Sequence, residues 1–329
     1  MAGPAADESA ESTGSAAPAR VADDTALPRR TQWRRALVSA LFLVVAVAAF
    51  GVALAGQWSE TVDRLGDQRP DALIGSLGLA LAGVYMSFLL WRGTLAVLGS
   101  RVPTPAAARL FFPTQLGKYL PGALWPVVAQ MRMGRELGVP RQRMALAFLL
   151  TLGLATLVGI LVGVAALPAL LQAEGPVVLF GLLALPVLLA LLVPRVINSL
   201  LDRALRVLRR PGLERPLAGR DIARGVLWAV AFWLVYGGHV WLLAVGLGAD
   251  PLEALPVTIG GFAIAFSLGP LLVVLPAGAG VREAVMVVLF SGLLTTPEAT
   301  AVALTSRGIL MLTDGLLALA AVLVPRRGR

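Results

Sequence analysis

The chain has 329 residues, of which 57% are hydrophobic and 14% charged, and its mean hydropathy of +0.81 is too high for a soluble protein of this length. The net charge of +9 comes largely from arginines in loops between apolar runs rather than on one basic face with aromatic residues, which argues against nucleic-acid binding. The absence of cysteine and the single histidine exclude disulfides, a cysteine nucleophile and a histidine-based metal cluster, and we expect neither a metal nor a cofactor.

The first elements are a polar tail and a membrane anchor. Residues 1–28 are small, polar and mildly acidic, which predicts a disordered cytosolic tail over 1–33 and no signal peptide. Four arginines then precede 36–55, a run of twenty uncharged residues that could cross about 30 Å as a helix. The loop after this span is poorer in arginine, so the positive-inside rule places the N-terminus in the cytosol.

A second span, 72–91, returns the chain to the cytosol. The apolar segment 110–131 follows, but three prolines interrupt it and prevent one straight helix, so we expect a re-entrant or interfacial element. These prolines are Pro113, Pro121 and Pro126. Because the surrounding region 92–143 has eight cationic residues and one acid, both of its ends are predicted to lie in the cytosol.

The middle of the chain contains two spans and a basic connector. The span 144–173 crosses outward and 175–194 crosses back. The connector 195–224 has eight arginines and three acids, which places it in the cytosol. Its apolar residues recur near helical spacing, which favours a helix lying on the inner membrane face. A solvated connector between two halves is the alternative.

The C-terminal part begins with the span 225–249, which crosses outward. Two apolar segments follow, 254–281 and 284–297, and the second has only 14 residues, about 21 Å of helix. Because that is short for a span, we expect the two segments to form a hairpin that starts and ends on the outer side. The last span, 298–325, returns the chain to a basic cytosolic tail, 326–329.

These elements predict an all-α, polytopic transmembrane bundle with six spans, a C-terminal hairpin and one proline-broken element. The protein would lie in the cell membrane with both termini in the cytoplasm. Its transmembrane domain, 34–325, would consist of the halves 34–194 and 225–325. Interrupted segments near Pro121 and Pro276 occupy corresponding positions in the two halves, which points to a transporter's binding site and is compatible with an internal repeat. A chance occurrence of proline and glycine is the alternative.

The stretch 266–283, FSLGPLLVVLPAGAGVRE, is predicted to form the main functional site. Pro276 interrupts its helix, and Gly278 and Gly280 loosen the backbone. A broken helix in hydrocarbon is tolerated only where protein covers it or a watery cavity reaches it. The glycine-rich turn also offers backbone N–H groups as an anion-binding nest, with Arg282 beside it.

Two motifs, QLGKYLPGALWP at Gln115–Pro126 and LPAGAGVREAV at Leu275–Val285, resemble the lysylphosphatidylglycerol synthase transmembrane-domain family, whose members are also called flippase-like proteins. The resemblance covers approximately residues 34–325. The family usually has Pro-Gly-Gly where this chain has Pro-Ala-Gly at 276–278. Its best-known members also carry a soluble aminoacyl-transferase domain, and this sequence ends before one. The resemblance therefore implies the lipid-translocating half without the synthase, and no enzymatic activity.

The predicted substrate-binding residues combine charged side chains of the membrane segments with glycine and proline at the two breaks. They are Lys118, Pro121, Gly122, Gly278, Gly280, Arg282, Glu283, Arg307 and Asp314. We expect Arg282 to hold a lipid phosphate and Glu283 to meet a cationic headgroup or to neutralise an arginine. Anchoring at the membrane surface is the alternative role for this charged pair. No catalytic residue is predicted.

The remaining charged groups are expected to find partners on other segments. Arg307 and Asp314 are seven residues apart, about 10 Å along a helix axis, so a direct ion pair is not expected and Glu283 with Arg307 is the favoured pairing. A purely structural salt bridge is the alternative to a binding role. Lys118 could bind phosphate or reach lipid headgroups. His239 is expected to be hydrogen-bonded between helices, with a proton relay as the alternative.

Together, the residues and the resemblance predict a flippase that moves a lipid with a charged or glycosylated headgroup between leaflets. Its predicted partners are membrane lipids, whether anionic, aminoacylated or polyprenyl-linked. The alternatives are a membrane-embedded transferase acting on polyprenyl-linked sugars, an accessory subunit of a separate synthase or glycosyltransferase, and a secondary transporter for small solutes.

Overall fold

The computed structural model describes residues 58–120, 125–171, 176–207, 212–213, 215–269 and 280–323. All of them belong to the second of the two units into which the chain divides, Ser39–Arg329. Several sequence-based predictions lie outside the described residues: the N-terminal tail, the first span, the basic C-terminal tail, and the breaks at Pro121 with Gly122 and at Pro276 with Gly278.

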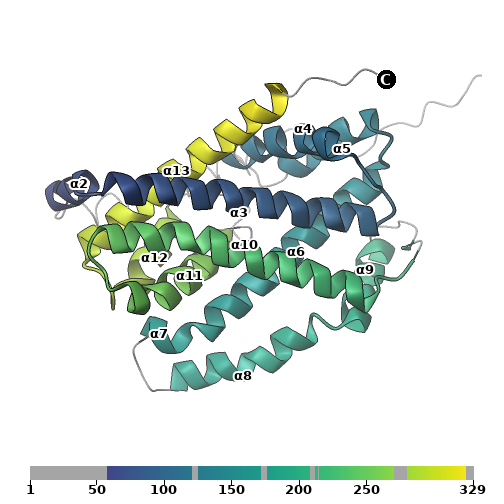
Figure 1. The fold of residues 1–329 in the computed structure, drawn as a ribbon. Coiled ribbons are helices and arrows are strands. Elements are labelled where there is room, and N and C mark those ends of the chain that lie inside the picture. Colours follow the sequence, from purple (N-terminus) through teal and green to yellow (C-terminus); the bar gives the residue numbers. More distant parts are fainter. Residues whose placement is uncertain are drawn as a thin grey trace, which may run out of the picture. The chain divides into compact units, whose positions relative to one another are not determined.

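The described residues form helices joined by short turns, without a strand among them. In chain order (Figure 1) the elements are α2 (Trp58–Gly66), α3 (Pro70–Val97), α4 (Thr104–Gln115), the 3-10 turn η1 (Leu116–Tyr119), α5 (Trp125–Glu136), α6 (Arg141–Ala165), α7 (Leu167–Leu171), α8 (Pro176–Ala190), α9 (Pro194–Val207), α10 (Gly219–Gly246), α11 (Pro251–Leu268), α12 (Val281–Leu289) and α13 (Thr296–Leu323).

Five of these helices are long and apolar enough to cross a membrane: α3, α6, α10, α11 and α13. Their lengths of 18 to 28 residues correspond to roughly 27 to 42 Å at 1.5 Å per residue. The last part of α8, Leu183–Ala190, passes the same test together with α9 and would make a sixth span. The predicted all-α, multi-pass bundle is therefore confirmed for the described part of the chain.

The crossing predicted over 175–194 differs in detail from the structure. The helix α8 ends at Ala190, and α9 leaves its last part at an angle of 65°. A bend here follows from Pro194, which lacks a backbone N–H and disfavours helical backbone at the residue before it. The helix predicted within the basic connector is present as α9.

The proline-broken element consists of two short helices, α4 and α5, which contact each other and the 3-10 turn η1. The first proline, Pro113, does not end α4, which continues to Gln115. The missing N–H of Pro113 removes one backbone hydrogen bond, to the carbonyl of Arg109 four residues earlier, and the helix ends two residues later. The interruption follows instead at η1.

The two arms of the predicted C-terminal hairpin correspond to α11 and α12, which contact each other and are followed by α13. The first arm starts at Pro251, where the side chain of Asp250 accepts hydrogen bonds from the N–H groups of Leu252 (2.9 Å) and Glu253 (3.0 Å). Such a cap satisfies backbone donors that a helix leaves free at its start. This arm ends at Leu268, so 254–281 is not one continuous helix.

The helix α10 contacts α3, α6, α11 and α13 and lies beside α3 along much of its length (Figure 1). A close approach to α11 depends on Gly237, because a Cβ at this position would lie 2.9 Å from the Cα of Ile259. Small residues allow helix backbones to approach in this way. Through these contacts α10 positions α11 and α13, two of the helices that surround the charged residues.

Candidate functional site

The first turn of α12 is capped by a side chain from within the same turn. Gly280 has a φ of 82°, a backbone conformation that glycine adopts without steric penalty. Its N–H donates a hydrogen bond of 2.7 Å to Oε2 of Glu283. This contact corrects one part of the predicted nest: the Gly280 N–H is bonded to a protein carboxylate and is not free for a phosphate.

The other oxygen of Glu283 lies between two guanidinium groups. Its Oε1 accepts hydrogen bonds from Nη2 of Arg282 (2.8 Å) and from Nη1 of Arg307 (3.1 Å). The predicted pairing of Glu283 with Arg307 is confirmed. The side chains of Glu283 and Arg282 are only 2% and 6% exposed, whereas that of Arg307 is 27% exposed. Two arginines and one glutamate leave this group with a net charge of +1.

A second ionic group forms around Asp314 of α13. Its Oδ2 lies 2.7 Å from Nζ of Lys118 and accepts a hydrogen bond of 2.5 Å from the hydroxyl of Tyr119. Both partners belong to η1, so this contact joins the proline-broken element to the last helix, α13. As expected from their spacing, Arg307 and Asp314 pair with residues of other elements rather than with each other.

We call these six residues the charged cluster: Lys118, Tyr119, Arg282, Glu283, Arg307 and Asp314. Two of its members share α13, where they are seven residues apart and therefore about 10 Å apart along the helix axis. With three cations and two carboxylates, the cluster has a net charge of +1. Charges inside a membrane protein are rare and face one another or a cavity, and here they connect α12, α13 and η1.

Two buried atoms of the charged cluster make no hydrogen bond to another described residue: Nε of Arg282 and Oδ1 of Asp314. The first is a donor and the second an acceptor. An unsatisfied buried polar group costs about 1–3 kcal/mol, so both atoms would gain from a polar ligand. Through Arg282 the cluster can therefore donate a hydrogen bond to an acceptor such as a phosphate oxygen, and through Asp314 it can accept one from a donor such as an ammonium or hydroxyl group.

The aromatic side of the cluster comes from α11. The guanidinium carbon of Arg282 lies 6.0 Å from the ring centre of Phe266, within the range of a cation–π contact. Phe266 in turn packs against the rings of Trp233 and Tyr236 of α10. The apolar wall on this side keeps the arginine in a low-dielectric environment, where its interactions with anions are strong.

His239 is hydrogen-bonded between helices, as predicted. Its Nδ1 is assigned as the donor to the carbonyl of Tyr236, so Nε2 accepts a hydrogen bond of 2.8 Å from the hydroxyl of Ser306 on α13. The carbonyl of His239 accepts a further hydrogen bond of 2.9 Å from Ser76 of α3. This fully buried histidine therefore connects three spanning helices next to Arg307.

The structure thus brings together five of the predicted site residues: Lys118, Arg282, Glu283, Arg307 and Asp314. Gly280 contributes through its backbone, and Pro121, Gly122 and Gly278 lie outside the described residues. Sequence reasoning missed Tyr119 and Ser306. The only signal for Tyr119 was its place beside Lys118, and Ser306 had none beyond its position before an intramembrane arginine.

Comparison with known proteins identifies the family to which this chain is related. The model of the lysylphosphatidylglycerol synthase TM region matches residues 35–318, a range that contains the whole charged cluster. A search of curated proteins found no match. The family match and the apolar helices together establish a multi-pass membrane protein. The chain belongs to the family of the lysylphosphatidylglycerol synthase TM region.

Proposed function

We propose that this protein is a lipid flippase of the cell membrane, with both termini in the cytoplasm, and that it acts as a transporter rather than as an enzyme. Its substrate would be a lipid with a charged or glycosylated headgroup. The observation that carries this proposal is the charged cluster, which joins η1 to α12 and α13 and has one donor and one acceptor without a hydrogen bond to any described residue. Membership in a family of lipid-handling membrane regions supports it.

The physical problem in lipid translocation is the headgroup. Moving a charged or hydrogen-bonding group into hydrocarbon without partners costs several kcal/mol. In the proposed mechanism the free Nε of Arg282 and the positive charge of the cluster replace the water around a phosphate. The free Oδ1 of Asp314 accepts a hydrogen bond from an amine or hydroxyl of the same headgroup, while the acyl chains stay in the bilayer.

The proposal is tested in proteoliposomes with a fluorescent headgroup-labelled lipid and a membrane-impermeant quencher. Wild-type protein should expose the inner-leaflet lipid to the quencher, and Arg282→Ala and Glu283→Gln should slow this exposure. Arg282→Lys keeps the positive charge but lacks the Nε donor, so it should retain only part of the rate. Arg135→Gln, a change at an exposed position of α5, serves as the matched control.

Equal rates in wild type, all variants and empty vesicles would contradict the proposal. The experiment also distinguishes a flippase from two alternative functions. A membrane-embedded transferase would yield a modified lipid when given a donor lipid. An accessory subunit would show activity only with a co-purified synthase or glycosyltransferase.

A further inference from the structure

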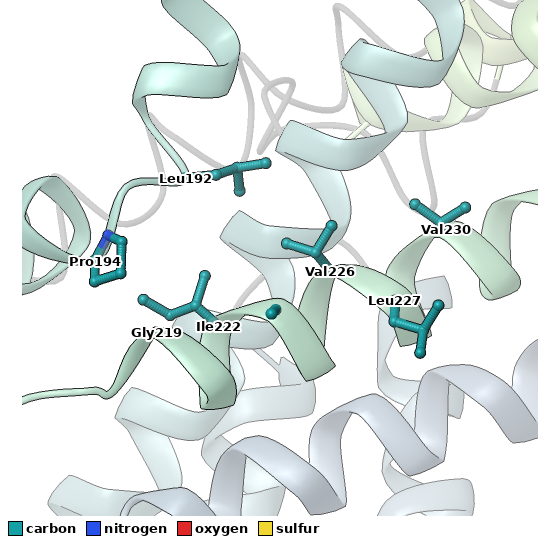
Figure 2. Close-up of a pocket in the computed structure, with 8 residues that line it drawn as sticks. Leu192, Pro194, Gly219, Ile222, Val226, Leu227 and Val230 are labelled. Atoms are coloured by element: carbon teal, nitrogen blue, oxygen red, sulfur yellow. The ribbon is translucent and has the colours of Figure 1, made fainter.

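An apolar groove runs along the first part of α10 and contains no residue of the charged cluster. Its volume is about 470 Å³, and the described side chains that line it are all apolar. Ile222, Val226 and Val230 lie along α10, with Leu192 and Pro194 across the groove (Figure 2). From the first to the last of its α10 residues the groove extends about 16 Å, a length suited to most of one lipid acyl chain.

The end of the groove is held in place by one asparagine of α9. The Nδ2 of Asn198 donates hydrogen bonds to the carbonyls of Leu217 (3.0 Å) and Pro194 (2.9 Å), and the N–H of Leu217 donates to its Oδ1 (2.8 Å). These bonds tie α9 to the segment that enters α10. They keep Pro194 beside Gly219, so the groove is a defined part of the fold.

Three exposed arginines belong to the chain at this end of the groove: Arg195, Arg220 and Arg224. Arg195 and Arg220 follow Pro194 and Gly219, which lie close together here, and Arg224 is one turn after Arg220 on the same side of α10. The nearby acid is Asp221, whose Oδ1 lies 4.0 Å from Nε of Arg220, and the Arg220 side chain remains 89% exposed. These three arginines and Asp221 together carry a net charge of +2.

We propose that this groove is a binding site for one anionic phospholipid, with an acyl chain along α10 and the phosphate beside the three arginines. The apolar wall alone would not select a lipid, since bilayer tails are as apolar as leucine side chains. The arginines supply the selectivity, because basic pockets at the membrane surface attract anionic headgroups and arginine matches phosphate geometry. This site is separate from the proposed transport site.

The test uses the full chain in phosphatidylcholine nanodiscs and a phosphatidylglycerol that carries a photoreactive diazirine in one acyl chain. Mass spectrometry of the cross-linked peptides should place the label on α10 between Ile222 and Val230. Unlabelled phosphatidylglycerol should compete for this label, whereas phosphatidylcholine with the same acyl chains and inorganic phosphate should not.

Different variants test the contact of the arginines with the headgroup and the contact of the groove with the acyl chain. One arginine near an anionic membrane surface corresponds to about a fivefold change in affinity, so Arg220→Gln combined with Arg224→Gln should weaken competition about 25-fold. Val226→Trp fills the groove and should remove the α10 label while the arginines remain. Arg135→Gln is the matched control on α5 and should leave both readouts unchanged.

Three results would overturn the proposal: equal competition by the two lipids, a label spread evenly over the other spanning helices, or unchanged labelling in both Val226→Trp and the double arginine variant. Arg282→Ala should leave the label unchanged, so a failure of this site and a failure of the proposed transport function are distinguishable.

Discussion

Two buried carboxylates, Glu283 and Asp314, are held in different ways. The Glu283 side chain is 2% exposed and both of its oxygens are bonded, Oε1 to Arg282 and Arg307 and Oε2 to the N–H of Gly280. The Asp314 side chain is 1% exposed, but only its Oδ2 is bonded to other described residues, while Oδ1 makes no hydrogen bond to them.

The partners of the two carboxylates also come from different parts of the chain. Those of Glu283 belong to the start of α12 and to α13, close together in sequence. Those of Asp314, Lys118 and Tyr119, belong to η1, and the tyrosine lies 195 positions earlier. We infer that Glu283 mainly stabilises the local fold, whereas Asp314 connects α13 to the distant turn η1 and has one oxygen, Oδ1, without a hydrogen bond to the described residues.

The largest effect on stability is expected for Glu283→Gln. Removing one partner of a buried ion pair typically costs 3–5 kcal/mol, because the other charge remains buried. Since Arg307 is 27% exposed and can reach polar surroundings, we expect a loss of about 3 kcal/mol. Circular dichroism during unfolding in mixed micelles measures this free energy. The exposed Glu60 on α2 provides the control Glu60→Gln, and a loss no larger than the control's would contradict the structural role.

A smaller loss of stability is expected for Asp314→Asn. The Lys118 side chain is 26% exposed, so it can find water or headgroups when its partner is neutralised, and we expect a loss of about 2 kcal/mol. Transport should fall more strongly, because the substitution turns the carboxylate that carries Oδ1 into an amide without negative charge. If Asp314→Asn destabilised the protein more than Glu283→Gln and left transport unchanged, the proposed division of roles would be reversed.

Tyr119→Phe should cost about 1.5 kcal/mol, the value for a hydrogen bond to a charged acceptor. The change removes the hydroxyl that donates to Asp314 and nothing else. Combined with Asp314→Asn, its effect should be less than additive, because both changes remove the same contact. Combined with Glu283→Gln, it should be additive. Unfolding of the single and double variants measures how strongly Tyr119 is coupled to each carboxylate. Equal coupling to Asp314 and Glu283 would contradict the division of the charged cluster into two separate ionic groups.

The smallest effect is expected for Ser306→Ala, about 1 kcal/mol. The change removes the donor to Nε2 of His239 but touches neither carboxylate, so its effect should add to those of the other variants. The same unfolding assay measures this loss. Ser291→Ala is the control, since the exposed Ser291 hydroxyl donates only within its own turn, to Val288. A loss equal to the control's would mean that the contact between α10 and α13 adds nothing measurable.

Much of the fold could be predicted because apolar runs of span length permit few alternatives to membrane helices. The pairing of Glu283 with Arg307 was also predictable, since two intramembrane charges in neighbouring helices need partners. The end of α11 at Leu268 and the persistence of α4 beyond Pro113 were not predicted. Helix ends depend on caps and on the packing of neighbouring elements, which hydropathy does not report.

By itself, the sequence determined that the chain is helical, that it crosses a membrane several times, and which rare charges lie within apolar segments. Only the tertiary structure decided that Lys118 and Tyr119 meet Asp314 and that Glu283 accepts a hydrogen bond from the Gly280 N–H. It also decided that Nε of Arg282 and Oδ1 of Asp314 make no hydrogen bond to the described residues. The physical reason is range. Hydropathy and local charge act within one segment, whereas a contact between η1 and α13 depends on how distant helices pack.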